Sequence, residues 1–143
     1  MKVYLASRYD RREEMKEHRK VLESHGITVT STWLDEKGSP TSDLGDESEV
    51  FYIEHAVKDL VDLEAADAIV FFSENPLEGF KRGSRHVEFG YALRADKRMY
   101  VVGKYKENIF HYLGYIERFD TLEDLIKGKG WDKKKLEKAK DMN

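Results

Sequence analysis

Residues 68–73 read AIVFFS, a continuous apolar run with the length of a buried β-strand. A second run of this kind, KVYLAS, occupies residues 2–7. Strands that are buried on both faces are typical of parallel sheets, whose two sides are covered by helices. The two runs therefore predict an α/β protein, and we expect the remaining sequence to supply the helices and the other strands.

The rest of the chain alternates between helical spacing of apolar residues and short apolar runs. The expected helices cover 10–24, 49–65, 84–95 and 121–127, a short helical piece covers 107–113, and the further strands cover 28–34, 99–103 and 115–119. Asp10 is the expected N-cap of the first helix, and Gly26 is its expected stop. The alternation predicts an open, mostly parallel sheet with helices on both faces, which binds ligands at the carboxyl ends of its strands.

The bulk properties narrow the class of protein. A length of 143 residues fits one domain, 1–143, with the lysine-rich tail after about 128 peripheral to it. The 25 basic and 28 acidic residues are well mixed, so no basic face for a nucleic-acid polymer is expected. The absence of cysteine excludes disulfides, thiolate metal sites and a cysteine nucleophile. No apolar run reaches the length of a signal peptide or a membrane span, so we expect a cytoplasmic protein without membrane contact.

The stretch 83–93, GSRHVEFGYAL, carries the strongest chemical signal. Ser84 follows a glycine and is expected to cap a helix, which places Glu88 in or just beyond the first turn, where the helix dipole favours a carboxylate. At 100° per residue, the apolar arc of this helix consists of Val87, Tyr91, Ala92 and Ala95. Glu88 falls in the middle of that arc, a costly position for a charge that is neither paired nor used.

The pattern alone leaves two interpretations of Glu88 open. One is a functional carboxylate, and the other is a buried ion pair with Arg8, Arg82 or Arg85. Asp59 is equally open, because it sits on the edge of the apolar stripe of the helix over 49–65. That stripe consists of Ile53, Ala56, Val57, Leu60 and Leu63. Spacing favours a solvated flank for Asp59 over a position facing a cleft.

Two further places hold polar residues of interest. Tyr4 lies in the first expected strand, where a tyrosine is usually part of the core. Ser7 and Arg8 follow that strand, at the position where a doubly wound fold binds an anion. The segment over 35–49 is rich in Gly, Ser and Asp and is expected to be a long loop.

At these residues the sequence resembles the nucleoside 2-deoxyribosyltransferase family, which includes the related nucleotide N-glycosidases. The resemblance runs from Lys2 to about Phe119 and rests on four segments in order, KVYLAS, KDLVDLEAADAIVFF, GSRHVEFGYAL and KENIF. The segment over 35–49 has no match to the classical transferases, and the tail after Thr121 carries no part of the resemblance.

The resemblance implies a single-domain, flavodoxin-like (Rossmann-like) fold and a double-displacement mechanism without a metal or organic cofactor. Glu88 would attack the anomeric carbon and form a covalent glycosyl-enzyme. Asp59 would bind the base and assist its protonation, and the Tyr4 hydroxyl would hold Glu88 in position. Asn108 would reach the 5′ end of the sugar from a neighbouring subunit, which implies a homodimer or a higher homo-oligomer.

The expected activity is therefore transfer or cleavage at the N-glycosidic bond of a small-molecule nucleoside or nucleotide, with a nucleoside deoxyribosyltransferase favoured. Ser7 and Arg8, with the basic group around Gly83 and Ser84, leave room for a 5′-phosphate, so a nucleoside 5′-monophosphate N-glycosidase (a hydrolase) is the alternative. A non-catalytic nucleotide-binding module is a further alternative, because the loop over 35–49 is unmatched. The aromatic cluster Phe110, His111, Tyr112, Tyr115 and Phe119 would suit an assembly surface.

Overall fold

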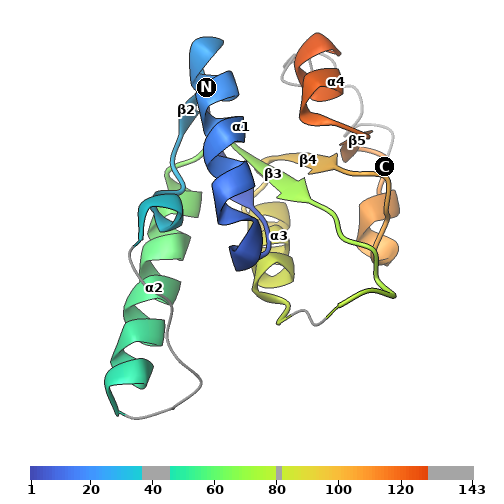
Figure 1. Cartoon of the computed structure of the whole chain (residues 1–143). Coiled ribbons are helices and arrows are strands. Elements are labelled where there is room, and N and C mark those ends of the chain that lie inside the picture. The colour runs from blue at the N-terminus through green and yellow to red at the C-terminus, as the bar shows by residue number, and fades with distance from the viewer. Residues whose placement is uncertain (37–45, 80–81, 129–143) are drawn as a thin grey trace.

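The computed structural model describes residues 1–36, 46–79 and 82–128. The expectations for the tail, and for most of the long loop, lie outside these residues. The strands are β1 (Lys2–Ala6), β2 (Thr28–Val29), β3 (Ala68–Phe72), β4 (Arg98–Val102) and β5 (Glu117–Phe119). The helices are α1 (Arg12–Ser24), α2 (Asp46–Glu64), α3 (Ser84–Arg94) and α4 (Leu122–Lys127), with 3-10 turns η1 (Tyr9–Arg11), η2 (Thr32–Asp35) and η3 (Ile109–Tyr112) (Figure 1). None of the described helices is both long and apolar enough to cross a membrane.

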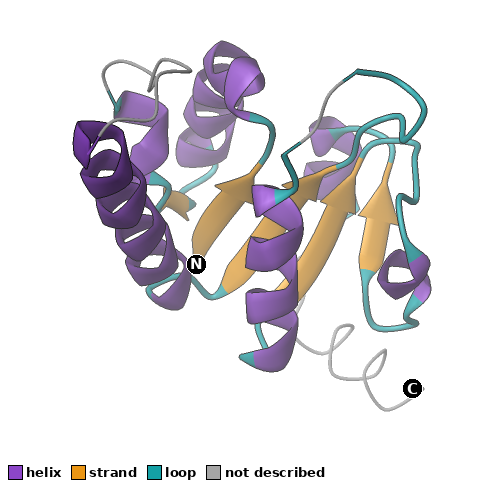
Figure 2. Ribbon diagram, turned by 90° about the horizontal axis from the view of Figure 1, so that it is seen from below, coloured by secondary structure: helices purple, strands orange, loops and turns teal. Residues whose placement is uncertain are grey.

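All five strands are parallel and form one sheet in the order β2-β1-β3-β4-β5 (Figure 2). This order is the flavodoxin-like one, in which the chain winds outward from β1 in one direction and then, from β3, in the other. The predicted fold class is therefore confirmed. The reversal places the carboxyl ends of β1 and β3 side by side, and a ligand site is expected there.

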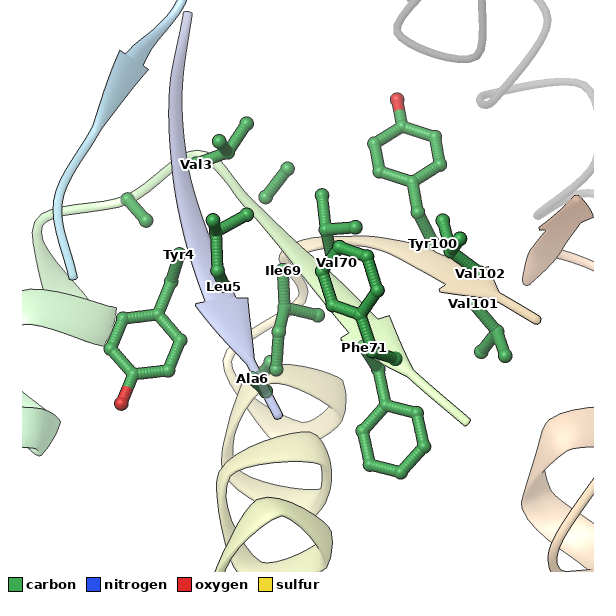
Figure 3. Close-up of a cluster of buried hydrophobic side chains, with 14 of the residues drawn as sticks. Val3, Tyr4, Leu5, Ala6, Ile69, Val70, Phe71, Tyr100, Val101 and Val102 are labelled. Carbon is green, nitrogen blue, oxygen red and sulfur yellow. The ribbon is translucent and has the colours of Figure 1, made fainter. Parts of the chain in front are cut away.

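The sheet is buried on both sides because its central strands are apolar at every position, as in β3. Figure 3 shows Tyr4 and Phe71 pointing to one side of the sheet, and Val3 and Tyr100 to the other. On one face the Phe71 ring lies 5.3 Å from the Phe89 ring of α3. On the other face the ring of Phe72 stacks at 5.1 Å on His18 of α1. Helices therefore cover both faces, as the sequence predicts.

Two predicted boundaries near the first two strands need correction. Asp10 lies inside η1, and α1 begins only at Arg12, so Asp10 is not its N-cap. Gly26 follows the end of α1 as expected, with a φ of 78° that suits glycine. The strand expected over 28–34 ends at Val29.

The chain leaves the sheet after β2 because side chains outside the sheet take over its hydrogen bonds. Thr32 donates from its backbone N–H to Asp62 of α2 at 2.9 Å, and from its hydroxyl at 2.5 Å. The Trp33 indole donates to the carbonyl of Leu5 at 3.0 Å. A β-branched, apolar sequence therefore forms a 3-10 turn here, since tertiary contacts override its strand propensity.

Helix α2 differs most from what the spacing of its apolar residues predicts. It begins at Asp46, three residues before the expected start, and its apolar stripe does not face the core. Ile53 is 63% exposed and Val57 is 58% exposed, whereas Leu63 is buried. The helix instead turns its other side toward β1 and α3. The side predicted to be solvated is therefore the one that faces the interior.

Candidate active site

A cleft of about 400 Å³ opens at the carboxyl ends of β1 and β3, a size typical of small-molecule sites. Its lining comes from the loops after β1, β2 and β3 and from the facing sides of α2 and α3. The lining residues are Tyr4, Ser7, Arg8, Tyr9, Asp10, Trp33, Glu36, Phe51, Tyr52, His55, Asp59, Arg82, Gly83, Ser84, Arg85 and Glu88. The topology thus brings together residues that are far apart in the sequence.

Glu88 is the fifth residue of α3, and its carboxylate accepts a hydrogen bond from the Tyr4 hydroxyl of β1. The buried side of α3 is formed by Arg85, Phe89 and Ala92, which flank Glu88 on the helix surface. Val87 and Tyr91, which the apolar arc predicts to be buried, are 68% and 36% exposed. Glu88 is therefore turned inward as expected, and Ala92 is the one member of the predicted arc that is buried on this side of the helix.

No arginine forms an ion pair with Glu88 among the described residues. The partners of the three arginines considered for this role are Asp10 for Arg8 (2.7 Å), Glu107 for Arg85 (2.5 Å) and the hydroxyl of Tyr52 for Arg82 (3.5 Å). The ion-pair interpretation of Glu88 is therefore wrong. Among the described residues, the hydrogen-bond donor to its carboxylate is the uncharged hydroxyl of Tyr4.

Burial raises the pKa of Glu88 to about 8. The nearby carboxyl group of Asp59 raises it further, and the hydrogen bond from Tyr4 works in the opposite direction by stabilising the charged form. A carboxyl group with such a pKa exchanges its proton near neutral pH. Perturbed carboxyl groups that lie in a cleft are typical of functional sites.

Asp59 of α2 lines the same cleft, so its expected place on a solvated flank is wrong. Its Oδ1 atom is buried and has no hydrogen-bond partner in the described part of the chain. Burial raises the pKa of Asp59 to about 7, and the carboxylates of Glu36 and Asp62 add to the shift. A carboxyl group with a pKa near 7 is suited to giving and taking a proton at neutral pH.

Tyr4 lies between the two carboxyl groups. Its side chain is fully buried, and burial raises its pKa, with further increases from the negative charges of Glu88 and Asp59. The phenol therefore stays protonated across the physiological range and acts as a permanent hydrogen-bond donor. Tyr4 fixes the orientation of Glu88 and does not exchange protons.

The other predicted residues divide into two groups. Ser7, Arg8, Gly83 and Ser84 all line the cleft. Gly83 occupies the N-cap position of α3 with a φ of 87°, so Ser84 is the first helical residue and not the cap. Among the described residues, no side chain makes a capping hydrogen bond at the start of this helix.

Asn108 does not line the cleft of its own chain. Its side chain caps η3 by accepting from the backbone N–H of Phe110 at 3.0 Å. Its amide nitrogen lies 3.4 Å from Nδ1 of His86. A local structural role is therefore established for Asn108, while a role toward substrate remains a prediction.

Several lining residues were not singled out from the sequence, namely Trp33, Glu36, Phe51, Tyr52 and His55. A signal for part of this group was present. Tyr52, His55 and Asp59 are spaced i, i+3 and i+7, so they share one side of α2. The more apolar neighbouring stripe drew attention away from them. Among the described residues there is no group of three or more His, Asp or Glu side chains arranged to hold a metal ion.

Comparison with solved structures finds this fold in two other proteins. One is a 2-deoxyribosyltransferase from the psychrotolerant bacterium Bacillus psychrosaccharolyticus, with a TM-score of 0.64 and 18% sequence identity over 95% of this chain and 96% of that one. The other is a conserved protein from Enterococcus faecalis, with a TM-score of 0.53 and 15% identity over 100% of this chain and 99% of that one. No protein-family model and no curated protein matches the sequence.

The chain therefore shares its flavodoxin-like architecture, over nearly its whole length, with a 2-deoxyribosyltransferase. Identities of 18% and 15% establish the fold alone. Any activity has to be argued from the cleft and its residues.

Proposed function

We propose that this protein cleaves or transfers at the N-glycosidic bond of a (2-deoxy)nucleoside through a covalent glycosyl-Glu88 intermediate. The observation that carries the proposal is the grouping of Tyr4, Asp59 and Glu88 in one cleft, with both carboxyl pKa values raised. The fold shared with a 2-deoxyribosyltransferase supports it, as does the sequence resemblance to that family.

In the first step a carboxylate oxygen of Glu88 bonds to the anomeric carbon while the bond from that carbon to the base nitrogen breaks. The electron pair of the broken bond goes to the base, and Asp59 supplies the proton that neutralises it. In the second step a nitrogen of another base, or a water molecule, bonds to the anomeric carbon while the bond from that carbon to Glu88 breaks, and the attacking group gives up its proton to Asp59. A base gives transfer, and water gives hydrolysis.

The reactive state holds a single proton, with Glu88 ionised and Asp59 protonated. Because the pKa of Glu88 is about 8 and that of Asp59 is about 7, the two forms that hold one proton are together most populated between pH 7 and 8, and the reactive form is the minor one of the two. Below that range both groups are protonated and the nucleophile is lost. Above it both are ionised and no acid remains.

The cleft favours a nucleoside over a 5′-monophosphate. Ser7, Arg8 and Ser84 line the cleft, and we expect them to meet the 5′ end of the substrate. Arg8 is already neutralised by Asp10 at 2.7 Å and by Glu74 at 3.8 Å, so it has little charge to offer a phosphate. The hydrolase acting on 5′-monophosphates is therefore the second candidate, and the exposed Arg82 is the residue that would support it.

A homo-oligomer is part of the proposal, with Asn108 acting on the cleft of a neighbouring copy. Asn108 is absent from its own cleft and is followed by exposed apolar side chains, Ile109 and Phe110. Those side chains suit a protein surface that is covered in an assembly. Activity that persists in full when the protein is diluted to a monomer would contradict this role.

The test is a panel of 2′-deoxynucleosides and their 5′-monophosphates, each incubated with and without a second base and analysed by chromatography. We expect free base from the nucleoside alone, a new nucleoside when the acceptor is present, and neither product with Glu88→Gln. Turnover that persists in Glu88→Gln would exclude the mechanism. Binding without any base release would instead favour the non-catalytic nucleotide-binding module.

A further inference from the structure

A second carboxylate is held at the α2 side of the cleft. Glu36 follows η2, its side chain is 9% exposed, and its Oε1 lies 2.5 Å from Nδ1 of His55. Its backbone carbonyl accepts from the guanidinium of Arg12 at 2.5 Å, and its backbone N–H donates to Trp33. Glu36 is therefore fixed in position from both its main chain and its side chain, and the mechanism proposed above does not use it.

Aromatic rings form the walls around this carboxylate. Phe51 and Tyr52 of α2 line the cleft, and the ring of Phe51 lies 3.8 Å from the ring of His55. Trp33, buried and held through its indole N–H, lies 6.2 Å from the ring of Tyr9. Flat apolar walls with a few fixed polar groups suit a planar heterocycle, which stacks on the rings and hydrogen-bonds through its edge.

The polar groups at this edge include an acid and an acceptor, beside the imidazole of His55 and the hydroxyl of Tyr52. Asp59 has a buried Oδ1 without a hydrogen-bond partner among the described residues. The neighbouring Asp62 is already engaged, because it accepts two hydrogen bonds from Thr32. Asp59 in its protonated form offers one donor, and the carboxylate of Glu36 offers only acceptors.

We infer that this edge selects an amino base over the corresponding oxo base, with the exocyclic amino group donating to Glu36 while Asp59 donates to the adjacent ring nitrogen. The inference rests on the proposed function and specifies its substrate class, nucleosides of adenine or cytosine. Adenine presents a ring nitrogen and an amino group side by side, and so does cytosine. Hypoxanthine and uracil present a carbonyl oxygen in place of the amino group, and it would face a carboxylate that has no proton to give.

The first experiment compares matched bases on the unaltered protein. Base release is measured from 2′-deoxyadenosine against 2′-deoxyinosine, and from 2′-deoxycytidine against 2′-deoxyuridine. Binding of free adenine against free hypoxanthine is measured by calorimetry. We expect the amino member of each pair to be favoured by about tenfold to a hundredfold, the usual effect of leaving one buried polar group unpaired.

The second experiment changes the acceptor into a group that can also donate. In Glu36→Gln the side-chain amide can donate to a carbonyl oxygen, so we expect the ratio of amino to oxo bases to fall by about tenfold or more. Asp35→Asn is the matched control, because Asp35 is the adjacent carboxylate and is bound by Arg19 outside the cleft at 2.7 Å. The control is expected to leave the ratio unchanged.

Each outcome addresses the base edge and the reaction separately. An oxo base used or bound as well as its amino counterpart by the unaltered protein overturns the inference, and so does an unchanged ratio in Glu36→Gln. Preferential binding of adenine without cleavage of any nucleoside supports the base edge and contradicts the proposed reaction. Cleavage that depends on Glu88 but shows no preference for amino bases supports the proposed reaction and contradicts the inference about the base edge.

Discussion

The two carboxyl groups assigned to the reaction, Glu88 and Asp59, come from two helices with very different surroundings. Glu88 of α3 lies against apolar residues and the Tyr4 hydroxyl, and burial is the main reason for its raised pKa. Asp59 of α2 lies among other polar groups; burial is again the main reason for its raised pKa, and the carboxylates of Glu36 and Asp62 add to it. One group is held in place by a neutral donor, and the other has a free buried oxygen.

This contrast teaches how two similar side chains can be assigned different tasks. A carboxylate that is oriented by a permanent donor keeps one oxygen fixed, which suits attack on carbon. A carboxyl group with a pKa of about 7 and a buried oxygen that no described residue engages can give its proton to a leaving group near neutral pH. The assignment can be tested because the two roles respond differently to substitution, to pH and to the leaving group.

The largest effect is expected from Glu88→Gln, because it removes the nucleophile and leaves the shape of the side chain. Base release should fall by roughly 10⁴-fold or more, measured by chromatography at a saturating nucleoside concentration. Glu54→Gln is the matched control, since Glu54 is exposed on the outer side of α2. A loss of less than about tenfold in Glu88→Gln would show that Glu88 is not the nucleophile, so that the roles of Glu88 and Asp59 are reversed or absent.

Asp59→Asn should reduce base release by about 10²- to 10⁴-fold, the usual contribution of a general acid. The loss should shrink for a 2-deoxyribosyl substrate whose leaving group departs without a proton, and Glu88→Gln should stay inactive on that substrate. Equal losses on both substrates would show that Asp59 does not act as the acid. This comparison distinguishes the acid from the nucleophile by whether the leaving group needs a proton, and not by the size of the loss alone.

The pH profile of the reaction should change in a different way in each of two variants. For the unaltered protein we expect a bell-shaped profile of kcat/KM with limbs near pH 7 and 8, values that belong to Glu88 and Asp59 as a pair. Asp59→Asn leaves Glu88 as the titrating group of the pair and removes a charge that raises its pKa, so the alkaline limb should vanish and the remaining limb should lie below about pH 8.

Tyr4→Phe removes the hydrogen bond that lowers the pKa of Glu88, so the acid limb should move to higher pH. The maximum rate should fall by about tenfold to a hundredfold, as expected for one hydrogen bond to a charged group. An alkaline limb that persists in Asp59→Asn, or an acid limb that does not move in Tyr4→Phe, would contradict the electrostatic account.

The smallest effect is on stability. The folded-state pKa of Glu88 lies above its ordinary value, so the folded protein binds a proton that the unfolded chain has lost between about pH 4.5 and 8. Binding of this proton stabilises the folded protein relative to the unfolded chain, and that stabilisation is lost as the pH rises from about 4.5 to 8. Glu88→Gln should be increasingly more stable than the unaltered protein from pH 5 to pH 8, by up to about 1.4 kcal/mol per pKa unit. Thermal unfolding at the two pH values measures it, and a constant difference would show that Glu88 is not desolvated.

The fold could be predicted from the sequence because its determinants are local and redundant. β3 is apolar at every position and buried at every position, so its pattern has one interpretation. The second half of the segment over 28–34 could not be predicted, because its geometry depends on Asp62 and Leu5, which reach it from elsewhere in the fold.

The site was predictable in part. Glu88 stood out as a charge within an apolar sequence, although Ala92 is the one member of the predicted arc that is buried beside it, together with Phe89. Asp59 could be assigned only through the family resemblance, since helical spacing pointed it toward solvent. The reason is that α2 exposes an apolar stripe and turns a polar, aromatic side to the cleft. Amphipathic patterns assume the opposite arrangement.

The most direct test of the account is the mass of the protein after brief exposure to a 2′-deoxynucleoside without an acceptor base, followed by acid quenching. The account predicts an added mass of one deoxyribosyl group, located by peptide mapping on Glu88 and absent from Glu88→Gln, together with an equal amount of free base. Base release with no adduct on Glu88 at any time, or an adduct on another residue, would contradict it.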